Sequence, residues 1–274
     1  MTGATMTGET AAGETVLAVE NLGVRFGGLV ALAGVSFEVR AGEVASLIGP
    51  NGAGKTTAFN AITGFLTPSE GAIRYRGSRI EGLRPNEIAD LGVVRTFQKT
   101  SVFAASSVFD NLLIGLHRRG GARLWEILLA LPRVRAEEAR LRAEAEEILD
   151  FVGLSARAGE PGGALPYGEQ RLLEVAGALA ARPSLLLLDE PVSGMNPVET
   201  ASFMAMLGKI RARGITILLV EHDMRMVMGV SDRVVVLNQG AIIAEGTPEE
   251  IQGNPEVIRA YLGKGADRRA AGRA

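Results

Sequence analysis

Apolar and polar residues alternate over short stretches at the start of the chain. Between Val16 and Val39 two such stretches are separated by Gly27 and Gly28, a pattern typical of strands joined by a hairpin turn. The following "GEVASLIG" is a short apolar run ending in glycine, which predicts a buried strand. "KTTAFNAITGFL" then shows helical periodicity, and "GAIRYRGSRI" predicts a further strand with a turn.

The middle of the chain has a different pattern. From Phe109 to Ala181 it is mostly helical, with interruptions at glycine and proline. Within it, Val134, Leu141 and Ile148 lie seven residues apart, on one face of a helix that is charged on its opposite side. A helix packed within a subdomain and a coiled-coil partner site are the two interpretations, and we favour the packed helix.

After Pro183 the alternation of strands and helices returns. "SLLLLDE" and "ITILLVEH" are continuous apolar runs, which suit parallel strands buried on both faces. A last hairpin is predicted around Gln239 and Gly240. The order is therefore a β-rich start, a βα unit, a helical insertion and a second α/β segment, which predicts an α/β fold.

Composition narrows the class of protein. The 274 residues allow one large α/β domain or a core with a smaller subdomain, and 47% apolar residues are enough for a sizeable core. Lys and Arg total 29 against 31 Asp and Glu, so no basic excess indicates nucleic-acid binding. The absence of cysteine excludes disulfides and thiolate sites, and two histidines argue against a His-rich zinc site.

Both ends of the chain are rich in small and polar residues. Residues 1–15 lack the basic-then-apolar order of a signal peptide, and we expect a disordered arm. The basic, Gly/Ala-rich residues 264–274 are expected to form a disordered tail, with a membrane or partner contact as the alternative. No run of about 18 uncharged apolar residues occurs, so no membrane-spanning helix is predicted.

A phosphate-binding loop is predicted where the buried strand meets the helix. "GPNGAGKTT" fits G-x-x-x-x-G-K-[ST], whose glycines let backbone N–H groups turn toward phosphate oxygens at a helix N-terminus. Lys55 would bridge the β- and γ-phosphates, and Thr56 would offer its hydroxyl to Mg²⁺. A chance glycine-rich turn is the alternative, and the flanking strand and helix argue against it. The predicted contacts are Gly49, Pro50, Asn51, Gly52, Ala53, Gly54, Lys55, Thr56 and Thr57.

Acids and a histidine follow the later apolar strands. Asp189 would hold Mg²⁺, mainly through water, and Glu190 would orient and deprotonate the attacking water. An Asp-Glu pair after a strand is a weak signal alone, because acids often end strands, and the phosphate loop strengthens it. His222 follows the next strand and would contact the γ-phosphate, since neighbouring parallel strands end at one edge. A surface or core histidine is the alternative.

Six motifs occur in a fixed order: "GPNGAGKTT", "RTFQ", "LPYGEQ", "LLLLDEP", "SGMNP" and "EHD". Over about residues 16–263 the chain thereby resembles the ATP-binding subunits of ABC transporters. The resemblance implies a P-loop NTPase (RecA-like) core, an antiparallel β subdomain and an inserted α-helical subdomain at about residues 100–181. "FGGLVAL", "VVRTFQ", "DNLLIG" and "SGMNPVE" are similar to the LivG-type ATPases of branched-chain amino-acid uptake.

The resemblance assigns roles to further residues. Phe26 matches the aromatic residue that stacks on adenine, a contact that stabilises analogous bases by roughly 1–3 kcal/mol. Gln98 matches the glutamine that reaches Mg²⁺ or the attacking water and reports to the membrane subunit. Residues 193–196 match the loop that crosses the dimer, with Asn196 where many relatives have Asp. The signature turn, which contacts the nucleotide of a second subunit, matches Pro166, Tyr167, Gly168 and Glu169.

This signature turn departs from the usual L-S-G-G-Q. Pro166 removes a hydroxyl and a backbone N–H, and Glu169 replaces an amide by a negative charge. Gly177 replaces a common arginine, and a glycine inside a helix costs ~1 kcal/mol relative to alanine. Two interpretations stay open. In the first, Gly168 and the positive end of the helix still hold the partner's phosphate. In the second, this turn serves the partner's ATP poorly, and the two ATP sites are unequal.

The resemblance implies a transport ATPase that uses ATP and Mg²⁺. Its expected partners are a second ABC ATPase subunit, two membrane permeases and, indirectly, a substrate-binding protein, at the cytoplasmic face of the cell membrane. The expected cargo is branched-chain or other hydrophobic amino acids. Urea-uptake and lipopolysaccharide-export ATPases are the nearest alternatives. A soluble ABC ATPase acting on nucleic acid is the other alternative, but the single nucleotide domain and short helical insertion argue against it.

Overall fold

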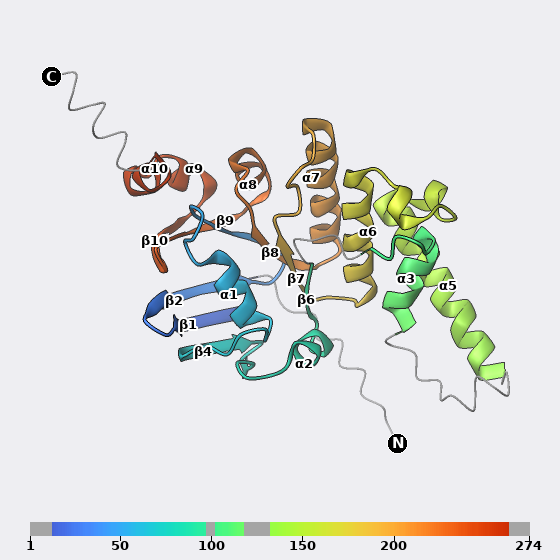
Figure 1. Ribbon diagram of the computed structural model, residues 1–274, viewed down its shortest axis with the longest axis horizontal. Helices are drawn as coiled ribbons and strands as arrows, with labels where there is room; N and C mark the ends of the chain where they lie inside the picture. Colours follow the sequence, from blue (N-terminus) through green and yellow to red (C-terminus); the bar gives the residue numbers. More distant parts are fainter. Residues whose placement is uncertain (1–12, 97–101, 118–131, 263–274) are drawn as a thin grey trace.

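The computed structural model describes residues 13–96, 102–117 and 132–262. In Figure 1 an antiparallel sheet lies at one end of the molecule and a group of helices at the other. The antiparallel sheet has the strand order β2-β1-β4-β5. Its strands are β1 (Thr15–Phe26), β2 (Leu29–Arg40), β4 (Glu70–Tyr75) and β5 (Ser78–Arg79). Gly27 and Gly28 form the turn between β1 and β2, as the sequence predicted.

The second sheet has six strands in the order β10-β9-β3-β8-β7-β6. Its pairings are parallel except for the antiparallel pair of β9 and β10. Every residue of β3, β7 and β8 is buried, as their continuous apolar runs predicted. The strands are β3 (Val44–Ile48), β6 (Val93–Arg95), β7 (Leu185–Asp189), β8 (Thr216–Val220), β9 (Arg233–Asn238) and β10 (Ala241–Gly246).

Helices cover both faces of this sheet. Leu186 and Leu188 of β7 belong to a buried cluster with α3, α5, α6 and α7, whereas Leu185 and Leu187 belong to one with α1, β1 and β2. The helices are α1 (Lys55–Ile62), α2 (Pro85–Asp90), α3 (Val108–His117), α5 (Pro132–Val152), α6 (Tyr167–Ala180), α7 (Pro197–Ala212), α8 (Met224–Val230), α9 (Pro248–Gln252) and α10 (Pro255–Leu262).

Helices α3, α5 and α6 gather at one end of the molecule (Figure 1). Leu141 and Ile148 of α5 are buried in the cluster that these helices share, and Val134 is half-buried. The prediction of a packed helix is therefore confirmed. Within the three described ranges, no helix is long and apolar enough to cross a membrane.

The α/β architecture confirms the predicted fold class. Because β3, β7 and β8 run parallel and adjacent, their carboxyl ends meet at one edge of the sheet. The phosphate loop follows β3, Asp189 ends β7 directly before Glu190, and His222 lies two residues after the end of β8. The sheet thus brings together residues that are more than 160 positions apart in the sequence.

Candidate active site

The phosphate loop, residues 49–54, connects β3 to α1 and lies against other parts of the backbone. Gly49 has φ +151°, and a Cβ at that position would lie 2.1 Å from the carbonyl oxygen of Leu237. Gly54 has φ +109°, and its Cβ would lie 2.6 Å from Leu32 Cδ2 and 2.9 Å from the Ala31 oxygen. Only glycine fits at these two positions, and the resulting curl leads directly into the N-terminus of α1.

Lys55 is the first residue of α1 and is almost buried, with 7% of its surface exposed. Its Nζ donates to the carbonyl oxygens of Gly49 at 2.6 Å and Pro50 at 3.1 Å. Burial lowers the pKa of Lys55 from its ordinary value, and the charges of Glu190 and Asp189 partly oppose this change. The ammonium group is therefore held inside the curl of the loop, where it can turn to a phosphate.

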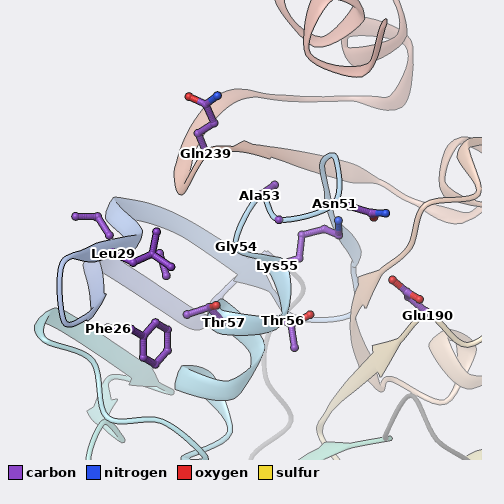
Figure 2. Close-up of a pocket in the computed structure, with 13 residues that line it drawn as sticks. Phe26, Leu29, Asn51, Ala53, Gly54, Lys55, Thr56, Thr57, Glu190 and Gln239 are labelled. Carbon is purple, nitrogen blue, oxygen red and sulfur yellow. The ribbon is translucent and has the colours of Figure 1, made fainter. Parts of the chain in front are cut away.

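A cavity of about 600 Å³ opens beside the phosphate loop (Figure 2). In this view Phe26 lies on one side of Lys55 and Glu190 on the other. The Phe26 side is apolar and partly exposed, which suits a flat aromatic base, while the loop supplies N–H groups for phosphates. The lining residues are Phe26, Leu29, Val30, Ala31, Asn51, Gly52, Ala53, Gly54, Lys55, Thr56, Thr57, Glu190 and Gln239.

Asp189 ends β7 and is paired with a residue that was not predicted from the sequence. Arg95, at the end of β6, places its Nη2 at 2.6 Å from Asp189 Oδ2, and both side chains are nearly buried. Arg95 Nη1 also donates to Asn60 Oδ1 at 2.7 Å, and its guanidinium lies 5.4 Å from the centre of the Phe59 ring. Arg95 thus connects α1, β6 and the predicted metal-side carboxylate.

Glu190 and His222 are brought together by the edge of the sheet. His222 Nδ1 lies 3.9 Å from Glu190 Oε1, although the residues follow different strands. Glu190 has φ +46°, a left-handed conformation that few non-glycine residues adopt, and its N–H donates to Val220 O at 2.8 Å. Unusual backbone held by surrounding hydrogen bonds is frequent at catalytic positions. A second unpredicted residue, Glu221, is buried at this same edge.

The residues that the family resemblance assigned outside the phosphate loop lie in three different places. Gln98 lies outside the described residues. Asn196 caps α7, because its Oδ1 accepts from Val198 N–H at 2.9 Å and Glu199 N–H at 3.0 Å. The signature-turn residues lie at the start of α6 and are absent from the lining of this chain's own cavity. Their predicted action on a partner's nucleotide stays a prediction.

The signature turn and the loop of residues 193–196 share one surface. A Cβ at Gly194 would lie 3.2 Å from the Tyr167 ring, and a Cβ at Gly168 would lie 2.9 Å from Glu199 Oε1. Tyr167 is 40% exposed, so this surface is available for contact. Pro166 occupies the N-cap of α6 and supplies no side-chain hydrogen bond to it.

Glu169 has a cationic neighbour. Arg157, in the short 3₁₀ helix η1 (Ser155–Arg157), places its Nε 3.3 Å from Glu169 Oε2. Arg157 Nη1 also lies 3.0 Å from Glu160 Oε1. One guanidinium therefore faces two carboxylates. A second guanidinium, that of Arg171, donates to the Tyr167 hydroxyl of the signature turn at 3.1 Å.

The oxygens at the site suit Mg²⁺ bound with a phosphate. Thr56 lines the cavity beyond β3, and Asp189 ends β7, which is separated from β3 by β8. In the described part of the chain, no group of three or more His, Cys, Asp or Glu residues could hold a metal ion by itself. Mg²⁺ typically takes one or two protein oxygens and completes its shell with substrate phosphates and water, so the site fits such an ion.

Comparisons with known proteins agree with this geometry. The ABC transporter family model matches residues 32–193, more than half of the chain. The chain belongs to the ABC transporter ATP-binding family. A second family model, the branched-chain amino acid ATP-binding cassette transporter, matches residues 241–267. ATP-binding cassettes of this family hydrolyse ATP, and the chain is an ATPase of that family.

Curated relatives and solved structures cover nearly the whole chain. The high-affinity branched-chain amino acid transport ATP-binding protein BraF of Pseudomonas aeruginosa is 46% identical, over 91% of this chain and 98% of its own. The high-affinity branched-chain amino acid transport ATP-binding protein LivG of Salmonella typhimurium is 47% identical, over 92% of this chain and 99% of the LivG chain. A nucleotide-free cassette from an ABC transporter has a TM-score of 0.80 at 34% identity, over 92% and 100%. A cassette in its ADP conformation has a TM-score of 0.81, at the same identity and coverage.

Proposed function

We propose that this chain is the ATP-hydrolysing subunit of an ABC importer for branched-chain or other hydrophobic amino acids. The observation that carries the proposal is the match of residues 241–267 to the branched-chain family model, together with 46–47% identity to the BraF and LivG proteins. The proposed partners are a second ABC ATPase, two permeases and a substrate-binding protein. The chain would act at the cytoplasmic face of the membrane.

Each part of the cavity has a proposed role in binding ATP. Phe26 stacks on the adenine, the backbone of residues 49–57 binds the phosphates, and Lys55 bridges the β- and γ-phosphates. Thr56 would hold Mg²⁺ together with Asp189 and Gln98, and the ion would neutralise charge on the phosphates. The apolar wall beside Phe26 and the buried ammonium of Lys55 support this orientation.

Hydrolysis needs a base and a group that binds the γ-phosphate. Glu190 orients the attacking water and accepts its proton, and His222 contacts a γ-phosphate oxygen. The 3.9 Å between His222 Nδ1 and Glu190 Oε1 supports a common site for these two groups. The water oxygen forms a bond to the γ-phosphorus while the bond from that phosphorus to the β,γ-bridging oxygen breaks, so ADP is the leaving group and inorganic phosphate is the other product. The proton of the attacking water passes to the Glu190 carboxylate.

The second ATPase would complete the site by placing its own signature turn over the γ-phosphate. ATP is then buried between two subunits, so ATP binding favours the closed dimer and hydrolysis releases it. The surface shared by Tyr167, Gly168, Gly194 and Glu199 would perform the reciprocal role for the partner's nucleotide. This two-state clamp is the element to which the permeases couple.

The two ATP sites of the dimer are proposed to be unequal. Pro166 offers no hydroxyl and Glu169 carries a negative charge in the turn itself, so this turn would stabilise a partner's γ-phosphate poorly. This chain's own site, with Glu190 and His222, would carry most of the turnover. Glu190→Gln should then abolish most ATP hydrolysis in the assembled transporter. An equal loss from the corresponding substitution in the partner would contradict unequal sites.

Transport in reconstituted vesicles tests the function. We expect radiolabelled leucine uptake that requires ATP and is lost in Glu190→Gln, while binding of a fluorescent ATP analogue is retained because Glu190 removes a proton rather than anchoring the nucleotide. Glu138→Gln, an exposed carboxylate on α5, is the matched control and should transport normally. Uptake of urea in place of leucine would overturn the cargo. Hydrolysis that depends on RNA or DNA would overturn the transport function.

A further inference from the structure

Glu221 is a carboxylate that the proposed reaction does not use. In the sequence it lies between Val220, the last residue of β8, and His222, and its side chain is fully buried. It is also absent from the lining of the nucleotide cavity. Burying a carboxylate is unfavourable unless hydrogen bonds satisfy its oxygens, so a carboxylate at this position has to be held by its surroundings.

The two carboxylate oxygens of Glu221 bind two different loops. Oε1 accepts from the backbone N–H of Val192 at 3.1 Å. Oε2 accepts from the backbone N–H groups of His222 at 2.7 Å and Asp223 at 3.1 Å. Val192 belongs to the loop after β7, and His222 and Asp223 belong to the loop after β8. One side chain therefore connects both loops by charge-assisted hydrogen bonds, which are stronger than neutral ones.

These two loops carry the residues proposed to perform hydrolysis. Glu190 lies two residues before Val192, and His222 is itself bound by Glu221 through its backbone. His222 Nδ1 also lies 3.5 Å from Glu221 Oε2. The strand pairing of Asp189 with Val220 aligns the two strand ends, and one further backbone bond joins Glu190 N–H to Val220 O at 2.8 Å. Beyond that bond, Glu221 connects the rest of the two loops through Val192 on one side and through His222 and Asp223 on the other.

We propose that Glu221 is a positioning residue for ATP hydrolysis. It holds the loops after β7 and β8 at one mutual distance, and thereby sets the spacing between Glu190 and His222. The inference rests on the roles proposed for those two residues. Because Glu221 acts through them and not on the nucleotide, it affects the chemical step and leaves ATP binding to the phosphate loop.

The substitution Glu221→Gln tests this inference in the full-length chain assembled with its partner ATPase. Glutamine has nearly the same shape, but its NH₂ group cannot accept a hydrogen bond, so one of the two loops loses its acceptor. Misplacing a catalytic group by about 1 Å can cost about a hundredfold in rate, and we expect kcat to fall by about that factor. KM for ATP and the Kd of a fluorescent ATP analogue should change by less than about twofold, because the contacts that bind ATP in the ground state are made by the phosphate loop and not by Glu221.

Asp232→Asn is the control. The Asp232 carboxylate accepts from the backbone N–H of Val44 at 2.9 Å and pairs with Arg211 at 3.0 Å, at the opposite end of the same sheet. This variant should lose stability and keep its kcat. A folded Glu221→Gln protein with unchanged kcat, or with the same kinetic change as Asp232→Asn, would overturn the inference. If Glu221→Gln keeps the kcat of the wild type while Glu190→Gln has lost turnover, only this inference fails. Full turnover in Glu190→Gln would instead refute the proposed function.

A measurement on the wild-type chain covers the case in which Glu221→Gln does not fold. Amide hydrogen exchange reports whether the N–H of Val192 is hydrogen-bonded, although this residue lies in a loop outside the strands. We expect it to exchange as slowly as the amides of β7, because its acceptor is fully buried. Exchange as fast as in the exposed β1–β2 turn would overturn the inference.

Discussion

The buried ion pair between Arg95 and Asp189 makes a quantitative prediction about stability. Arg95→Met replaces the guanidinium by an apolar side chain that fits beside the Phe59 ring. The substitution removes the 2.6 Å contact to Asp189 Oδ2 and the 2.7 Å hydrogen bond to Asn60. Since the Asp189 side chain is only 5% exposed, its carboxylate loses this partner at a position with little access to water.

The expected loss is a substantial part of the total stability. Removing one partner of a buried ion pair costs about 3–5 kcal/mol, compared with about 5–15 kcal/mol for the unfolding of a whole domain. For a chain of this size each 1 kcal/mol lowers the melting temperature by about 2–4 °C, so Arg95→Met should lower it by about 6–20 °C. Thermal and urea unfolding without nucleotide or metal measure the effect directly.

A double-mutant cycle identifies the cause. Arg95→Met with Asp189→Asn removes both charges, so the double variant should be less destabilised than the sum of the two single variants. Sites that do not interact are additive within about 0.3–0.5 kcal/mol. Additivity within that range, or a melting temperature for Arg95→Met equal to the wild type, would refute the reasoning. Arg84→Met, in the exposed pair with Glu87 at 3.0 Å, is the control and should melt like the wild type.

Three further predictions concern the phosphate loop and helix α6. Burial lowers the pKa of Lys55 below its ordinary 10.5, so this lysine loses its proton at lower pH than an exposed one. The affinity for a fluorescent ATP analogue should therefore fall as the pH rises toward 10. The fall should be smaller in Lys55→Arg, because a guanidinium keeps its proton in this range. A parallel titration of both proteins would contradict this. Gly54→Ala places a Cβ 2.6 Å from Leu32 Cδ2 in left-handed backbone, so it should weaken ATP binding and cost at least about 1–2 kcal/mol of stability. Gly177→Ala, where a Cβ meets no atom within 4 Å, should instead stabilise α6 by ~1 kcal/mol and leave ATP binding unchanged, as measured by urea unfolding and titration.

Most of the proposed catalytic groups could be predicted because their signals are local. The phosphate loop needs glycine at fixed spacing. The buried run of β7 ends at Asp189, directly before Glu190, and that of β8 ends at Val220, two residues before His222. Parallel strands in adjacent positions then require these ends to meet. The negative charge of Glu169 was also visible in the sequence, but its neighbour Arg157 was not, because the two are joined only by the fold of the loops between α5 and α6.

The sequence by itself determined the kind of chemistry, the order of the elements and the residue types that bind phosphate, since each follows from spacing along the chain. Only the tertiary structure decided which side chains hold these residues in place. Arg95 meets Asp189 across 94 positions, and Glu221 meets Val192 across 29. The physical reason is that a hydrogen-bond partner is set by strand order and burial. Strand order leaves no periodic pattern, and the burial of a single polar residue leaves none either. An arginine at the end of a strand or an acid before a histidine looks the same in the sequence whether it is solvated or buried.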